Sequence, residues 1–81
     1  MEHAQKRGLA RLLLRWPEYR VNLQRRAKED PYLLDLIGAY ETACEAVEYW
    51  SHADTIVASE RAEEYRQLLI ATEHDILTKI V

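Results

Sequence analysis

Glycine is scarce in this chain, which has only 2 glycines among its 81 residues. Phosphate-binding loops, tight hairpin turns and strand bulges depend on glycine, because its backbone adopts conformations that other residues avoid. The shortage therefore argues against nucleotide-binding folds and all-β folds together. The hydrophobic content of 48% is ordinary for a folded protein, and a chain of this length forms one domain. We expect a single all-α domain over residues 1–81.

Residues 1–29 are predicted to form a basic amphipathic helix with a proline kink. On a helical wheel, Arg7, Arg11 and Arg15 lie opposite an apolar arc of about 100°. The arc contains Leu9, Leu12, Leu13 and Trp16, and beyond the proline it continues with Tyr19, Leu23 and Ala27. Pro17 lacks the backbone N–H that a helix interior needs. We therefore expect a kinked helix, or two helices nearly in line.

Asp30-Pro31 marks the start of a second helix, because Asp accepts hydrogen bonds from free N–H groups and Pro at the first helical position loses none. The apolar residues that follow share one arc of about 140°. They are Leu33, Leu36, Ile37, Tyr40, Ala43, Cys44, Val47 and Trp50. We expect helices over residues 31–50 and 54–80, with Ser51 or Asp54 capping the second. Together they form an antiparallel hairpin.

The last helix carries apolar residues on two sides. The main arc, which is predicted to pack on the preceding helix, contains Ala58, Ala62, Tyr65, Leu68, Leu69, Thr72, Ile76 and Ile80. Ile70, Leu77 and Val81 form a second strip about 100° or more away, which the same partner helix cannot cover. Since twofold dimers are the commonest closed assemblies, we expect a homodimer that buries this strip and completes a helical bundle. The alternative is a monomeric bundle in which the N-terminal helix covers it.

Charge is divided along the sequence, although the formal net charge is only −3. Residues 1–28 hold 8 Lys and Arg against 2 Glu, and the remainder holds 3 against 12 acidic residues. The candidate residues for binding phosphates or another anionic partner are Arg7, Arg11, Arg15, Arg25 and Arg26. No helix-turn-helix, basic zipper or set of stacking aromatics accompanies them. Our main interpretation is therefore that these arginines are solvated or face the acidic residues of the next helix.

The candidate chemical groups are few. Glu41, Glu45 and Glu48 form an acidic stripe, and His52 continues it, but the Glu-x-x-His pair of di-metal bundles is missing. The stripe lies away from the apolar arc, so we expect a solvated face, with no metal and no cofactor. Cys44 lies inside the apolar arc without a neighbouring base, so we assign it to the core. With no catalytic residues in evidence, the chain is not expected to be an enzyme.

The hypothesis for function is a small non-enzymatic helical interaction or regulatory module, acting as a homodimer with a possible further protein partner. A nucleic-acid-binding regulator that uses the basic N-terminal helix is the alternative. Tyr49 is expected to be exposed among acidic neighbours as an interface anchor. A single cysteine allows no intrachain disulfide, and every apolar run, such as Leu12 to Leu14, is far too short to span a membrane, so we expect a cytoplasmic protein without a transmembrane segment.

Overall fold

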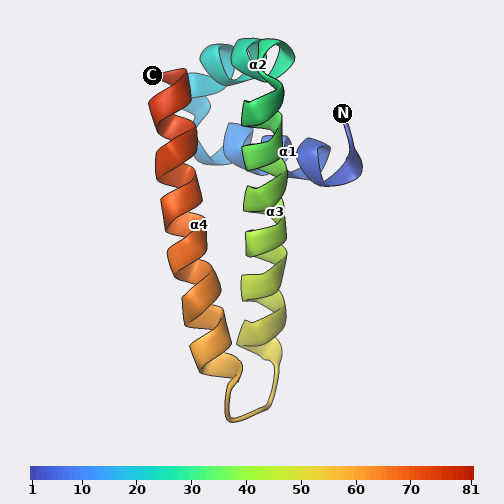
Figure 1. The fold of residues 1–81 in the computed structure, drawn as a ribbon, viewed down its shortest axis with the longest axis vertical. Helices are drawn as coiled ribbons and strands as arrows, with labels where there is room; N and C mark the ends of the chain where they lie inside the picture. Colours follow the sequence, from blue (N-terminus) through green and yellow to red (C-terminus); the bar gives the residue numbers. More distant parts are fainter.

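The computed structural model describes all residues from 1 to 81, and they form four α-helices and one turn of 3₁₀ helix, with no strand (Figure 1). In chain order the elements are α1 (His3–Arg15), η1 (Pro17–Tyr19), α2 (Arg20–Glu29), α3 (Pro31–His52) and α4 (Ala58–Ile80). The predicted all-α fold is confirmed. The long helices α3 and α4 lie antiparallel, which gives the molecule dimensions of 42 × 22 × 20 Å.

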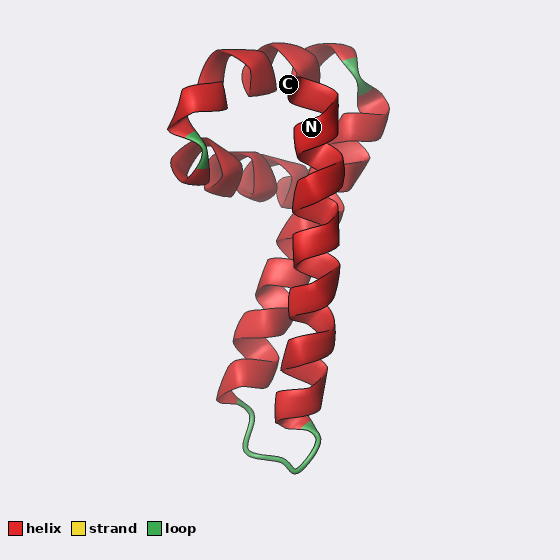
Figure 2. Ribbon diagram, turned by 90° about the vertical axis from the view of Figure 1, so that its left-hand side faces the viewer, coloured by secondary structure: helices red, strands yellow, loops and turns green.

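The segment before α3 folds back on itself (Figure 2). Helix α1 ends where the N–H of Trp16 bonds to the carbonyl of Leu12 at 2.8 Å, and Pro17 then begins η1. Trp16 itself has non-helical backbone angles, φ −125° and ψ 67°. Helix α2 then runs back in the opposite direction across the end of the hairpin (Figures 1 and 2). The two segments are therefore not in line, because the chain turns where proline cannot continue the hydrogen-bond pattern of α1.

Helix α3 begins where the sequence predicts. The Asp30 carboxylate accepts hydrogen bonds from the backbone N–H groups of Tyr32 and Leu33, at 3.0 and 3.2 Å. Pro31 occupies the first helical position. The cap satisfies two N–H groups that would otherwise lack a partner at the helix start.

The turn between the long helices lies later than predicted. Helix α3 extends to His52 and α4 starts only at Ala58, so Ser51 is still helical. Neither Ser51 nor Asp54 caps α4. The N-cap residue of α4 is Val57, and no side chain accepts a capping hydrogen bond at this helix start. The Ser51 hydroxyl instead accepts a hydrogen bond from Arg66 at 3.2 Å, which joins the two helices near the loop.

The core lies where the N-terminal elements meet the half of the hairpin remote from the loop. Its buried residues come from all four helices: Leu12, Leu23, Ala27, Leu33, Ile37, Tyr40, Cys44, Ile76 and Ile80. Leu9, Leu13 and Trp16 pack against this cluster, so the apolar side of α1 is used within the chain. Toward the loop, α3 and α4 have no third helix beside them (Figure 2).

The predicted second strip on α4 is divided between the core and the surface. Leu77 packs against the core cluster. Ile70 is 56% exposed and Val81 is 73% exposed. Within a single chain, packing against the core therefore covers Leu77 but leaves Ile70 and Val81 exposed.

Both glycines lie where α1 crosses α3. A Cβ on Gly8 would overlap the carbonyl oxygen of Ile37 and lie 2.9 Å from Ile37 Cγ2. Gly38 is buried beneath the first turn of α1, where a Cβ would lie 3.3 Å from Gln5 Cγ. Glycine costs up to about 1 kcal/mol within a helix. Close contact with the α3 backbone explains the glycine at position 8, whereas at Gly38 only side chains of α1 and its N-cap residue lie near.

Candidate interaction surfaces

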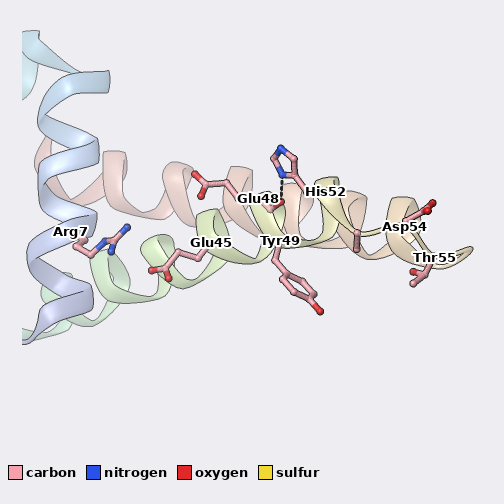
Figure 3. Close-up of a pocket in the computed structure, with 8 residues that line it drawn as sticks. Arg7, Glu45, Glu48, Tyr49, His52, Asp54 and Thr55 are labelled. Atoms are coloured by element: carbon pink, nitrogen blue, oxygen red, sulfur yellow. Dashed lines mark hydrogen bonds between the residues drawn. The ribbon is translucent and has the colours of Figure 1, made fainter.

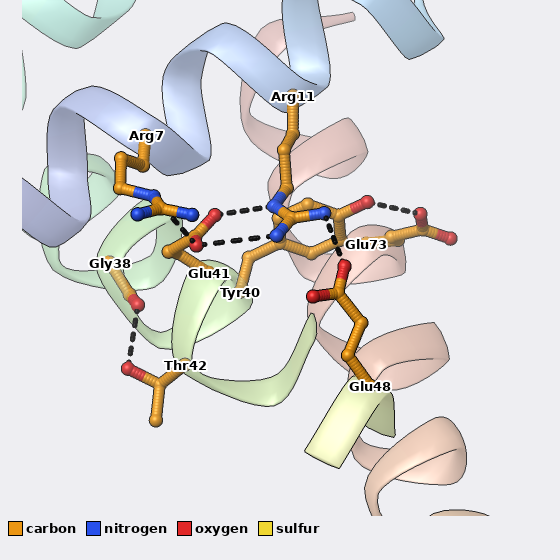
Figure 4. A network of polar contacts seen from close by, with 8 residues as sticks. All are labelled: Arg7, Arg11, Gly38, Tyr40, Glu41, Thr42, Glu48 and Glu73. Carbon is orange, nitrogen blue, oxygen red and sulfur yellow. Dashed lines mark hydrogen bonds and ion pairs between the residues drawn. The ribbon is translucent and has the colours of Figure 1, made fainter. Parts of the chain in front are cut away.

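Ion pairs connect α1 to the hairpin (Figure 4). Arg11 Nε lies 2.5 Å from Glu41 Oε1, and Arg7 Nε lies 3.3 Å from Glu41 Oε2. Arg11 Nη1 also reaches Glu48 Oε1 at 3.3 Å. The Glu41 side chain is fully buried, although the sequence analysis placed it on a solvated face. That expectation was wrong for Glu41 because α1 crosses α3 directly over this residue.

A second carboxylate connects α1 to α4. Arg15 Nε lies 2.6 Å from Glu73 Oε2, and the hydroxyl of Tyr40 donates a hydrogen bond to the same oxygen at 3.1 Å. Glu73 is nearly buried, so this contact joins three helices in a partly water-free position. Charge-assisted bonds of this kind are stronger than bonds between neutral groups.

These contacts change the acidity of the groups involved. Burial by itself raises the pKa of Glu41, but the hydrogen bond and positive charge of Arg11, together with Arg7, outweigh it and hold the pKa below the usual 4.5. The same hydrogen bond raises the pKa of Arg11. Burial raises the pKa of Tyr40 and of the Cys44 thiol. Cys44 is therefore a protonated core residue at neutral pH.

The lowered pKa of Glu41 predicts that acid weakens the docking of α1. A carboxylate whose pKa is lower in the folded state contributes stability above its unfolded pKa, and this contribution is lost as the pH falls through the folded value. The loss should begin below a pH of about 4.5. Thermal unfolding of wild type and Glu41→Gln between neutral and acidic pH isolates the effect from that of other carboxylates. The stability difference between the two proteins should shrink as the pH falls, and a constant difference would contradict the assignment.

The five predicted anion-binding arginines are placed on two helices. Arg7, Arg11 and Arg15 of α1 are paired with carboxylates of the hairpin. Arg26 of α2 lies 4.0 Å from Asp30, and Arg25 is exposed with no ion pair. Most of the basic charge on α1 is thus compensated inside the molecule.

An open polar hollow lies beside the ion pairs, toward the loop (Figure 3). Its lining residues are Arg7, Glu45, Glu48, Tyr49, His52, Ala53, Asp54 and Thr55. His52 Nδ1 lies 2.7 Å from the backbone carbonyl of Glu48, and the polar side chains are spread along the helix and loop. The structure brings together no group of three or more His, Cys, Asp or Glu residues with metal-site geometry. Tyr49 is exposed, as expected, with its ring edge-on to Trp50 at a centroid distance of 5.0 Å.

One face of the hairpin has no other element over it, and its α3 side is apolar. Helix α1 passes behind the hairpin in Figure 1, and Figure 2 shows α1 and α2 projecting to that same side. On α3, the residues roughly opposite Glu41 recur at alternating four- and three-residue intervals. They are Tyr32, Leu36, Ala39, Ala43, Ala46 and Trp50, and α4 adds Tyr65 and Leu68. We call this surface the open face.

Exposure varies across the open face. Tyr32 is 60% exposed and Leu68 is 53% exposed, while Ala43 is buried. At one end, Lys79 Nζ lies 4.6 Å from the centroid of the Tyr32 ring, which places both helices at the same surface there. No charged residue occurs in the α3 stripe, so this part of the surface is suited to an apolar contact.

Comparisons with protein-family models, curated proteins and solved structures found no match to this chain. Among its helices there is none with both the length and the apolar character needed to cross a bilayer.

Proposed function

We propose that this protein is a small non-enzymatic helical module that binds an apolar helical surface of a protein through its open face. The observation that carries the proposal is the uncharged stripe from Tyr32 to Trp50, which spans about 27 Å of α3 and has no helix over it. Contiguous apolar patches on a folded protein mark contact surfaces.

The shape of the open face indicates the kind of partner. Small residues, Ala39, Ala43 and Ala46, occupy the middle of the stripe, and larger residues lie toward its ends: Tyr32, Leu36 and Trp50, of which Leu36 also packs against the core. Small residues let a second helix approach closely, so that its side chains pack between those of α3 and α4. A stripe without charges offers no partner for a buried charge, so the matching surface is itself apolar.

Nucleic-acid binding through the N-terminal segment receives less support. The three arginines of α1 already contact Glu41 and Glu73, so phosphates would have to compete with carboxylates held in place by the fold. Binding of duplex or single-stranded probes at low salt, measured by fluorescence anisotropy, would favour this alternative.

A charged substitution in the open face tests the proposal. Ala39 is exposed, so Ala39→Arg should leave the fold intact while placing a charge in the contact. Ala10→Arg, at an exposed position of α1 outside the open face, is the matched control. Circular dichroism should show equal helix content in both variants. Sedimentation of the purified chain measures self-association. Capture from extract identifies other partners, and each captured protein is then purified and mixed with the chain to test whether the complex forms again.

The expected result is an association that wild type and Ala10→Arg share and that Ala39→Arg loses. A complex that forms equally well with Ala39→Arg would contradict use of the open face. A purified chain that neither self-associates nor forms any rebuilt complex would contradict the proposed function as a whole.

A further inference from the structure

We propose that the occupant of the open face is a second copy of this chain, packed antiparallel about a twofold axis that crosses the helices at the level of Ala43 and Leu68. The inference rests on the proposed function and names the partner of the same surface. The two hairpins would form a four-helix bundle. The part of α3 and α4 near the loop, which has no third helix beside it in one chain, would then pack against the partner's helices.

Ala43 and Leu68 lie at the same height in the hairpin. Lys79 Nζ lies 4.6 Å from the centroid of the Tyr32 ring. Ala43 is eleven residues from Tyr32 along α3, and Leu68 is eleven residues from Lys79 along α4. Because α3 and α4 run antiparallel with the same rise per residue, equal separations along the chain from one contact lead to equal heights. A single twofold axis that runs across both helices can therefore pass beside Ala43 and Leu68.

The α3 stripe is complementary to itself about this axis. Leu36 and Trp50 lie seven residues to either side of Ala43, about 10 Å along the helix. Antiparallel packing sets Leu36 of one protomer against Trp50 of the other and brings Ala39 near Ala46, with the buried Ala43 beneath the contact. Large residues at the ends and small ones at the centre allow the helices to approach closely along the whole stripe.

The charged residues on the α4 side of the open face are complementary in the same arrangement. Arg61 and Asp75 lie seven residues to either side of Leu68 on the same side of α4. A twofold axis at Leu68 places Arg61 of each protomer opposite Asp75 of the other, which gives two equivalent ion pairs. Arg61 is held in its own chain only by an exposed contact with Glu64 at 3.3 Å, which is weak enough to exchange.

A parallel dimer fits the same surface poorly. With the helices of both copies pointing the same way, Leu36 would stand level with Asp75 of the partner, an apolar residue against a charge. The loop halves would also lie side by side, and residues 45–67 hold six acidic residues against two arginines. Like charges brought together in this way oppose association.

Cysteine crosslinking tests the arrangement. In a Cys44→Ala background, Leu68→Cys places a thiol at the proposed axis, where it meets its own copy. Gln67→Cys, exposed on a neighbouring side of α4, is the control. A short bifunctional maleimide should link Leu68→Cys into a covalent dimer and leave Gln67→Cys largely monomeric. A dimer of wild-type chains in which Leu68→Cys does not crosslink would overturn the antiparallel arrangement.

Charge reversal gives an independent measurement. Arg61→Glu and Asp75→Arg should each weaken the dimer about tenfold, because each places like charges at two symmetric contacts. The double variant should recover most of the affinity. Equal weakening in the single and double variants would overturn the pairing. Wild-type protein that sediments as a monomer at all concentrations would overturn the homodimer, whereas a rebuilt complex with another protein that is lost in Ala39→Arg would leave the proposed function standing.

Discussion

Arg11→Met should destabilise the protein by about 3 kcal/mol, because it removes the closest cation from a fully buried carboxylate. Arg7 remains 3.3 Å from Glu41, which is why the expected cost is at the lower end for a broken buried pair. Denaturant unfolding measures the loss, and hydrogen exchange should show that the amides of α1 lose most protection.

The same substitution at an exposed ion pair is the control. Arg66→Met removes a contact with Glu63 in which the side chains are 48% and 58% exposed, and such pairs contribute about 0–1 kcal/mol. Combining Arg11→Met with Glu41→Leu should recover much of the loss, since an apolar pair leaves no buried charge. A double variant less stable than Arg11→Met would show that Glu41 acts through some contact other than Arg11.

Gly8→Ala should destabilise the protein by about 2 kcal/mol, even though alanine favours helices. The new methyl group would overlap the carbonyl oxygen of Ile37, and backbone atoms cannot move aside as a flexible side chain can. Helix α1 would have to move away from α3, which would lengthen the contacts of Arg7 and Arg11 with Glu41. Denaturant unfolding and the exchange rates of α1 amides measure the effect.

Gly38→Ala provides the opposite expectation. Its Cβ would meet only flexible side chains, Gln5 Cγ at 3.3 Å and Glu2 Oε1 at 3.5 Å, so the gain in helix propensity should keep the variant as stable as wild type or slightly more so. If Gly8→Ala and Gly38→Ala have equal effects, close backbone contact at Gly8 is not what fixes the position of α1.

Local sequence signals predicted the start of α3 well. Asp30 and Pro31 act through hydrogen bonds within a few residues, and these do not depend on the rest of the fold. The turn before α4 was misplaced because Ser51 and Asp54 can cap a helix in principle, while packing between α3 and α4 decides where each helix ends. Ser51 bonds to Arg66 across the hairpin instead.

The buried polar contacts could not be predicted from helical periodicity alone. Glu41 shares its side of α3 with the exposed Glu45 and Glu48, so the pattern does not show which carboxylate α1 will cover. Gly38, on the same polar side, was the available signal, since a glycine within a helix indicates that another element packs closely against it. The open face was also not predicted. The apolar arc of α3 is about 140° wide and was assigned entirely to the core, although one partner helix buries an arc of only about 100°.

The order of the ion pairs along the chain has a consequence during synthesis. Arg11 meets Glu41 thirty residues later, and Arg15 meets Glu73 fifty-eight residues later. Of the four helices, α1 is therefore synthesised first and completes its contacts last, and Leu12 stays accessible to chaperones and proteases until α4 has emerged.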